Sequence, residues 1–190
     1  MSAERVTRGL RDLAGLAEGL TALSEQAAAL ARRYAATLRQ GGTLFFVGNG
    51  GCAATAQHIA TEYVVRFRET RRPFAAAALT ADGALLTAAG NDVGFDQVFA
   101  RQVTALCRAG DLLMIHSTSG ESPNLLEAAR AARSKGVPVV ALLGRGGGAL
   151  RALVDEALVI PSDETSHIQE LQLTLEHLIC ELVEEELGTR

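Results

Sequence analysis

Five short apolar runs, most of them separated by helical segments, are the feature of this sequence that most constrains its fold. The runs do not alternate apolar with polar residues, which indicates strands buried on both faces. Strands that alternate with helices indicate parallel pairing and a sheet covered by helices on both sides. The predicted strands are residues 43–47, 74–79, 111–115, 137–143 and 156–160. We therefore predict an α/β fold with a doubly wound, flavodoxin-like, five-stranded parallel sheet.

A long amphipathic helix is predicted over residues 3–40, where apolar residues recur at steps of three and four. A helix of that length overhangs a small domain, so we expect residues 1–40 to serve in oligomer packing and residues 43–190 to form the α/β core of one domain. Short helical pieces are expected after the second strand. The other predicted helices are residues 52–67, 95–107, 122–135 and, at the C-terminus, 164–187.

Composition excludes several classes of protein. The net charge of −4 gives no basic excess for phosphate backbones, so we expect no direct nucleic-acid partner. No run of about 20 apolar residues exists to span a membrane, and the N-terminus carries charges where a signal peptide needs an apolar core. The cysteines, Cys52, Cys107 and Cys180, are odd in number and form no CxxC pair, which fits a reducing cytosol. We expect a cytoplasmic protein.

Two loops that follow predicted strands have the chemistry to bind a phosphate. The first is the run Gly48-Asn49-Gly50-Gly51-Cys52, whose glycines let a ligand approach the backbone at the start of a helix. Its sequence GNGGCA matches the dinucleotide fingerprint GxGxxG poorly. The second loop crowds four hydroxyls before Pro123, at Ser117, Thr118, Ser119 and Ser122. Ser119 or Ser122 could instead be a simple helix N-cap, but the cluster favours a phosphate site.

Two helices carry residues that suit a metal ion. His58 and Glu62 are four residues apart and share a helical face, although such a pair is more often a surface hydrogen bond. Gln169 and His177 lie about 12 Å apart along the last predicted helix. They reach one ion only by leaning together or by coming from different chains, and His177 could be a partly buried histidine bonded to a neighbour. Two histidines and a carboxylate near a phosphate pocket suit aldose–ketose isomerisation, which moves a proton between C1 and C2.

Four blocks of the chain stand out: GNGGCAATAQHIATE, LTAAGNDVGFDQVFARQV, GDLLMIHSTSGESPNLLEAAR and IPSDETSHIQELQLTLEHLICELVEEEL. They resemble the successive signature blocks of bacterial phosphoheptose isomerases, members of the sugar isomerase (SIS) domain family. The resemblance runs from about residue 5 to the C-terminus. It implies conversion of D-sedoheptulose 7-phosphate to D-glycero-D-manno-heptose 7-phosphate, the first step of heptose precursor synthesis, on a parallel sheet of the SIS type.

The resemblance also implies a homotetramer with active sites between subunits and one zinc ion per subunit. The implied metal ligands are His58, Glu62, Gln169 and His177, with Glu62 as the proton-transferring base and His177 as the acid. A carboxylate bound tightly to zinc is a poor base, so the two roles of Glu62 are separate hypotheses. The implied substrate pocket consists of Asn49, Gly50, Gly51, Cys52, Glu62, Asp92, Ser117, Thr118, Ser119, Ser122 and Gln169.

Three residues depart from the family pattern. Cys52 stands where a phosphate-binding serine is usual, and its thiol is a weaker donor. His116 replaces a small residue and is either a polar contact or a packed imidazole, while His167 replaces a common arginine. The alternative function is a non-catalytic SIS scaffold resembling the protein that associates with the replication initiator DnaA. Such proteins lose the histidine at the position of His177, so its presence favours catalysis.

Overall fold

The computed structural model describes residues 3–188 and contains one sheet of five parallel strands in the order β2-β1-β3-β4-β5. This is the order of a flavodoxin-like doubly wound sheet, so the predicted fold class is confirmed. The strands are β1 (Leu44–Val47), β2 (Ala76–Ala78), β3 (Leu112–Ser117), β4 (Val139–Leu143) and β5 (Glu156–Val159).

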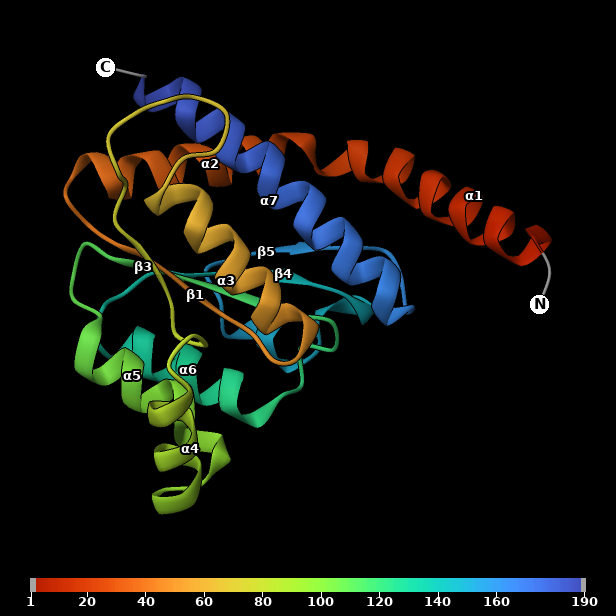
Figure 1. The fold of residues 1–190 in the computed structure, drawn as a ribbon. Helices are drawn as coiled ribbons and strands as arrows, with labels where there is room; N and C mark the ends of the chain where they lie inside the picture. The colour runs from red at the N-terminus through yellow and green to blue at the C-terminus, as the bar shows by residue number, and fades with distance from the viewer. Residues whose placement is uncertain (1–2, 189–190) are drawn as a thin grey trace.

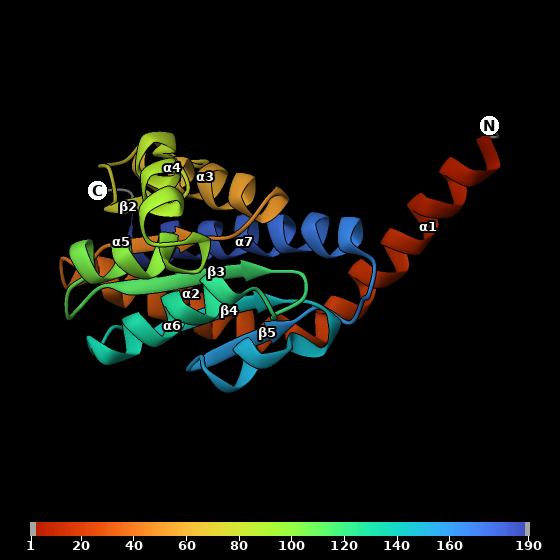
Figure 2. The same cartoon turned by 90° about the horizontal axis from the view of Figure 1, so that it is seen from below.

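Helices cover both faces of the sheet (Figures 1 and 2). On one face lie α2 (Ser24–Arg39), α3 (Gly51–Val64) and α7 (Thr165–Leu187), and on the other lie α5 (Val98–Leu106) and α6 (Pro123–Ser134). Outside α5 lies α4 (Gly83–Asp92), joined to it by the 3-10 turn η2 (Phe95–Gln97). Two further 3-10 turns, η3 (Arg145–Gly147) and η4 (Ala149–Ala152), connect β4 to β5.

Successive strand residues point into two separate cores. In β1, Leu44 and Phe46 pack under α2, α3 and α7, whereas Phe45 and Val47 pack against α5 and α6. All four residues are buried, because a strand with helices on both sides has no face left for water. This explains why the central strands are apolar without alternation.

The predicted single helix over residues 3–40 is wrong in one respect. The chain forms α1 (Ala3–Gly19), the 3-10 turn η1 (Leu20–Leu23) and then α2. Leu23 leaves helical geometry with φ −96° and ψ 0°. The hydroxyls of Thr21 and Ser24 bond to carbonyls three residues earlier, both at 2.8 Å. Such side-chain bonds compete with the backbone hydrogen bonds of a helix. Gly19, just before the turn, has a low helix propensity. The break therefore has a local cause.

The helix α1 extends away from the rest of the molecule (Figure 2). It contains no buried residue, and its apolar residues Val6 and Leu10 are 66% and 64% exposed. Only Leu13 and Leu16 touch the core beneath α2. Within residues 3–188, no helix is both long enough and apolar enough to cross a membrane.

Candidate active site

The two predicted phosphate loops leave the carboxyl ends of neighbouring strands. The first loop (residues 48–52, the Gly loop) follows β1, and the second (residues 117–122, the serine loop) follows β3, which pairs with β1. The helices that follow them, α3 and α6, pack on opposite faces of the sheet. The strand order reverses between β1 and β3, and a doubly wound sheet binds its ligands in the crevice at that point.

The Gly loop needs its glycines for steric reasons. A Cβ on Gly48 would lie 2.7 Å from the backbone of Cys52, and Gly50 has a φ of 54°. A Cβ on Gly51 would lie 2.5 Å from the side-chain oxygen of Gln169. Gln169 on α7 therefore covers the loop at the N-terminus of α3.

The serine loop uses some hydroxyls and leaves others available. Ser117 Oγ accepts the Gly120 N–H at 2.9 Å, and Ser119 Oγ accepts the Glu121 N–H at 3.2 Å. Ser122 occupies the N-cap position of α6, but its side chain makes no capping hydrogen bond within the described chain. The simple N-cap alternative therefore does not account for the Ser122 hydroxyl, which is half-buried beside Pro123.

A pair of asparagines joins the two loops. Asn49 Nδ2 donates to Asn124 Oδ1, and Asn124 Nδ2 donates to Asn49 Oδ1, both at 2.9 Å. Asn124, in the first turn of α6, is 1% exposed. The reciprocal amide contact fixes the start of α6 against the Gly loop, so both loops are placed together before a ligand arrives.

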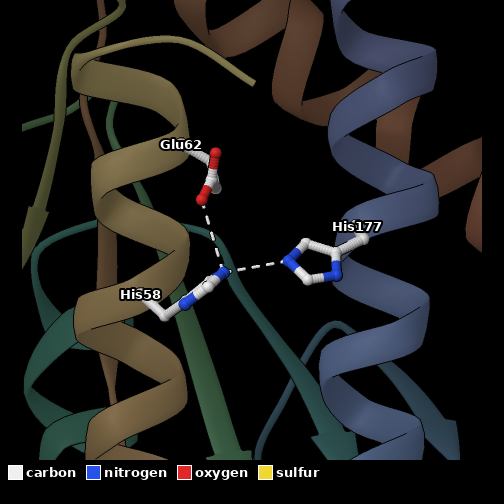
Figure 3. A group of neighbouring side chains, drawn as sticks. All are labelled: His58, Glu62 and His177. Carbon is white, nitrogen blue, oxygen red and sulfur yellow. Dashed lines mark hydrogen bonds and ion pairs between the residues drawn. The ribbon is translucent and has the colours of Figure 1, made fainter. Parts of the chain in front are cut away.

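The predicted histidines and carboxylate converge between α3 and α7 (Figure 3). His58 Nε2 lies 3.0 Å from His177 Nε2 and 3.3 Å from Glu62 Oε1. The ligand atoms of all three residues lie within 4.8 Å of one another. His58 and Glu62 come from one face of α3, and His177 reaches them from α7, which packs beside α3. We call these three residues the His–Glu–His cluster.

The surroundings of His177 hold its ring in place. Phe67 stacks on the imidazole with ring centres 5.4 Å apart and planes 16° apart. Burial lowers the pKa of His177, and the neighbouring His58 lowers it further, against the opposing effect of Glu62 and Glu176. A lowered pKa favours the neutral imidazole, which is the form that binds metals.

The geometry of the His–Glu–His cluster fits a metal ion. Ligand atoms at 2.0–2.1 Å from a tetrahedral zinc ion lie about 3.3 Å from one another. The His58–His177 and His58–Glu62 separations of 3.0 and 3.3 Å are close to that edge length, and the third pair lies within 4.8 Å. Two imidazoles and one carboxylate are also the ligand types of open, catalytic zinc sites. These three residues can hold a metal ion.

Two predicted residues lie apart from the cluster within this chain. Gln169 lies against Gly51, which precedes His58 by about 10 Å along α3. Asp92 is exposed at the end of α4, in a groove between α4, α5 and α6 on the other side of the sheet. The role of Gln169 as a metal ligand and that of Asp92 as a substrate contact stay predictions. Each role requires either a movement of the residue or a second copy of the chain.

The departures from the family pattern have distinct surroundings. His116 is fully buried, and its Nε2 lies 2.8 Å from Oε1 of the fully buried Glu176. It is thus a polar contact within the core. His167 is half-buried in the first turn of α7, with Nδ1 3.0 Å from Glu170 Oε2. Cys52 is 3% exposed, and its thiol donates to Gln172 Oε1 at 3.4 Å.

Sequence analysis missed several residues that shape the site. Three of them, Gln172, Glu176 and Glu184, are polar residues at buried positions of α7. For Gln172 and Glu176 the signal was present, because both positions fall on or beside the helix face that carries Ile168, Leu175 and Ile179. Glu184 lies nearly opposite that face, on the side of α7 that carries His177, and its spacing gives no such signal. Phe67 lies outside any regular element, and no pattern in the sequence marks it.

Glu184 fastens the segment after α3 to α7. Its carboxylate accepts the N–H groups of Phe67, Arg68 and Glu69 at 3.0–3.2 Å and pairs with Arg71 Nε at 2.7 Å. Arg71 also donates to the carbonyl oxygens of Glu62 and Tyr63 at 2.7 and 3.0 Å. This network fixes the segment that places Phe67 on His177.

Comparison with known proteins agrees with this architecture. The family model of the SIS domain matches residues 11–144. A phosphoheptose isomerase of Solidesulfovibrio magneticus is 54% identical over 156 residues, 82% of this chain and 76% of that protein. The structure of a phosphoheptose isomerase from Neisseria gonorrhoeae superposes with a TM-score of 0.91 at 39% identity, covering 96% of this chain and 98% of the other. One from Francisella tularensis gives 0.90 at 35% identity, with 97% and 100% covered.

The fold therefore defines a sugar isomerase domain, with two loops at the strand-order reversal and a cluster between α3 and α7 whose residue types could hold a metal ion. Within that class, the chain belongs to the phosphoheptose isomerase family. The resemblance predicted from the sequence blocks is confirmed.

Replacing Glu184 with Gln will lower the free energy of unfolding at pH 7 by about 2–3 kcal/mol, because Arg71 and the backbone N–H groups lose a buried carboxylate. Burial raises the pKa of Glu184, but the three N–H groups and Arg71 lower it more, so the net pKa is depressed. A depressed pKa gives stability that is present above the ordinary glutamate pKa of about 4.3 and is lost as the pH falls through the folded value.

Chemical denaturation of both proteins between pH 7 and pH 3 measures this effect. The difference in the free energy of unfolding between wild type and variant should have its full value at pH 7 and should shrink below about pH 4. Glu186→Gln is the matched control, because Glu186 pairs with Arg39 at the surface of the same helix, and it should change stability by less than about 0.5 kcal/mol. A Glu184→Gln variant as stable as wild type at pH 7 would contradict the fastening role.

Proposed function

We propose that this protein is an aldose–ketose isomerase that converts D-sedoheptulose 7-phosphate into D-glycero-D-manno-heptose 7-phosphate, the first step of heptose precursor synthesis. The observation that carries the proposal is the His–Glu–His cluster of His58, Glu62 and His177, two of whose residues lie on the helix that begins at the Gly loop. The relatives named phosphoheptose isomerases, about half identical to this chain, support the choice of substrate.

In this proposal the two loops grip the phosphate, which holds the distant reacting carbons in place. The half-buried Thr118, Ser119 and Ser122 offer hydroxyls, and the N-terminus of α3 offers backbone N–H groups. The proposed pocket also includes Asn49, Gly50, Gly51, Cys52, Glu62, Asp92, Ser117 and Gln169. Binding by hydroxyls and N–H groups needs no lysine or arginine.

Glu62 and His177 are the proposed proton carriers. Glu62 removes a proton from C1 of the ketose while His177 gives a proton to the oxygen on C2, which forms an enediol. The carboxylic acid of Glu62 then returns its proton to C2, and His177 takes the proton from the oxygen on C1, which leaves the aldose. A neutral imidazole can perform this exchange, and the lowered pKa of His177 supports that state.

As a hypothesis separate from the role of Glu62 as base, we propose that zinc occupies the cluster, one ion per subunit, with His58, Glu62, Gln169 and His177 as ligands. The ion would polarise the sugar oxygens at C1 and C2. Edge lengths near those of a tetrahedral site support zinc. Because Gln169 covers the Gly loop, its proposed role as a ligand fits best with an ion shared between chains or with a shift of its side chain.

The proposed assembly is a homotetramer with active sites between subunits. The exposed apolar residues Val6 and Leu10 on α1 support an interface that one chain does not supply. Asp92, on the far side of the sheet from α3, supports a pocket shared between copies, in which it reaches a neighbour's substrate. Three unpaired cysteines, all buried, support a cytoplasmic location. Nothing in the proposal calls for a membrane or nucleic-acid partner.

Incubation with sedoheptulose 7-phosphate tests the function directly, with the aldose product followed by chromatography or NMR. Turnover should fall when a chelator strips the metal and return on addition of zinc. Replacing Glu62 with Gln should lower kcat by at least about 100-fold, because the amide accepts no proton. The control Glu186→Gln changes an exposed carboxylate near the end of α7 that pairs with Arg39 and should leave kcat unchanged. Absence of product from the wild type at high enzyme concentration would favour the scaffold alternative.

Replacing Leu10 with Asp should break the tetramer into smaller species, because a charge would enter an apolar contact between chains. Circular dichroism should stay unchanged, since Leu10 contacts no core residue of its own chain. Light scattering coupled to size exclusion measures the mass, and Arg8→Asp on a different face of α1 is the control. A variant that remains tetrameric would remove α1 from the proposed interface.

A further inference from the structure

Gln172 is a fully buried amide that contacts both phosphate-type loops from α7. Its Nε2 donates to the carbonyl oxygen of Leu142 at 2.7 Å and to that of Ser117 at 3.3 Å. Its Oε1 accepts the thiol of Cys52 at 3.4 Å. Ser117 begins the serine loop, Cys52 ends the Gly loop, and Leu142 lies in β4. One side chain thus connects two loops, a central strand and the helix that carries His177.

Both donors of the Gln172 amide and one acceptor site of its oxygen are used within the core. Its NH₂ group offers two donors, and both are directed to carbonyl oxygens, while its oxygen takes the thiol proton. The exposed fraction of Gln172 is 0%, so water does not replace a lost partner. A shift of α7 against either loop would leave buried polar groups unpaired, which costs free energy. The connection therefore holds the loops in one arrangement.

The thiol of Cys52 lies between the two loops. Burial raises its pKa, and hydrogen bonds to sulfur from the Gln169 side chain and the Thr118 backbone lower it in part. The one proton of the thiol is directed to Gln172. Cys52 therefore joins the Gly loop to Gln172 instead of offering a donor to the phosphate, which is left to the N–H groups and hydroxyls.

We propose that Gln172 is a positioning residue: acting through Cys52 and Ser117, it fixes the spacing of the Gly loop and the serine loop for binding the phosphate of the substrate. The proposal rests on the proposed function only where it takes these loops as the phosphate site. It assigns Gln172 no contact with the substrate. Replacing Gln172 should therefore change the binding of phosphate. It should leave the positions of the proton-transfer groups Glu62 and His177 unchanged.

The test compares two buried glutamines. Gln172→Met keeps the volume of the side chain and removes all three hydrogen bonds. Gln102→Met is the matched control, because Gln102 is also buried and its Nε2 donates to two carbonyl oxygens, of Leu79 at 2.9 Å and Val98 at 3.0 Å. Both variants should lower the Tm. Gln172→Met should weaken binding of inorganic phosphate about tenfold and raise KM by a similar factor, with a smaller change in kcat.

Gln102→Met should leave the phosphate Kd and KM at their wild-type values. A general loss of packing would lower the active fraction, and with it kcat, in both variants alike. The proposal is overturned if Gln172→Met binds phosphate as tightly as wild type, or if Gln102→Met weakens it equally. If Gln172→Met does not fold, the variant Gln172→Asn takes its place, because it keeps a buried amide on a side chain one methylene shorter. Its Kd for inorganic phosphate is then compared with that of the wild type.

A double-mutant cycle with Cys52→Ala tests the route of the effect. If Gln172 acts on the Gly loop through the thiol, the two substitutions are not additive, and the double variant binds phosphate more tightly than the sum of the single losses predicts. Additive losses would overturn the proposed route. Phosphate binding is measured without turnover, so a wild type that binds phosphate but makes no aldose would refute the proposed function while leaving this test intact.

Discussion

The packing of α7 against α3 and the carboxyl ends of the central strands is the constraint on which the rest of the structure depends. It brings His177 to 3.0 Å from His58. On its inward face the same helix carries Gln172, bonded to the loops, and Glu176, paired with the buried His116 of β3 at 2.8 Å. Buried polar contacts of this kind fix one arrangement, because any slip leaves an unpaired group. The chain thus fixes the proposed phosphate end and the proposed proton-transfer end of the site with one helix.

Much of the fold follows from local sequence, because strands buried on both faces read as continuous apolar runs. The five strands and the helices of the α/β core lie within a few residues of their predicted ranges. The break at Leu20–Leu23 was not predicted, because the apolar periodicity passes through it unchanged. Its local marks are Gly19 and the hydroxyl contacts of Thr21 and Ser24. The 3-10 turns after β4 were also missed, because a run of three glycines at 146–148 specifies little regular structure.

Contacts of the site between residues close in sequence could be predicted, whereas contacts between distant residues could not. The i,i+4 spacing of His58 and Glu62 was enough to predict a shared face. Helical spacing also related Gln169 to His177, but only the packing of α7 on α3 shows that Gln169 lies on Gly51 while His177 reaches the cluster. The partners of His116 and Cys52 are 60 and 120 residues away along the chain. No periodicity encodes such pairings, so the sequence left the roles of these two residues open.

The central claim is that His58, Glu62 and His177 together hold one metal ion next to the phosphate loops. Zinc K-edge X-ray absorption on the protein loaded with one equivalent of zinc tests it most directly. The account predicts two imidazole nitrogens and at least one oxygen at about 2.0–2.1 Å, with one imidazole lost in a His177→Ala variant. A spectrum dominated by sulfur at about 2.3 Å, or one that His177→Ala leaves unchanged, would contradict it.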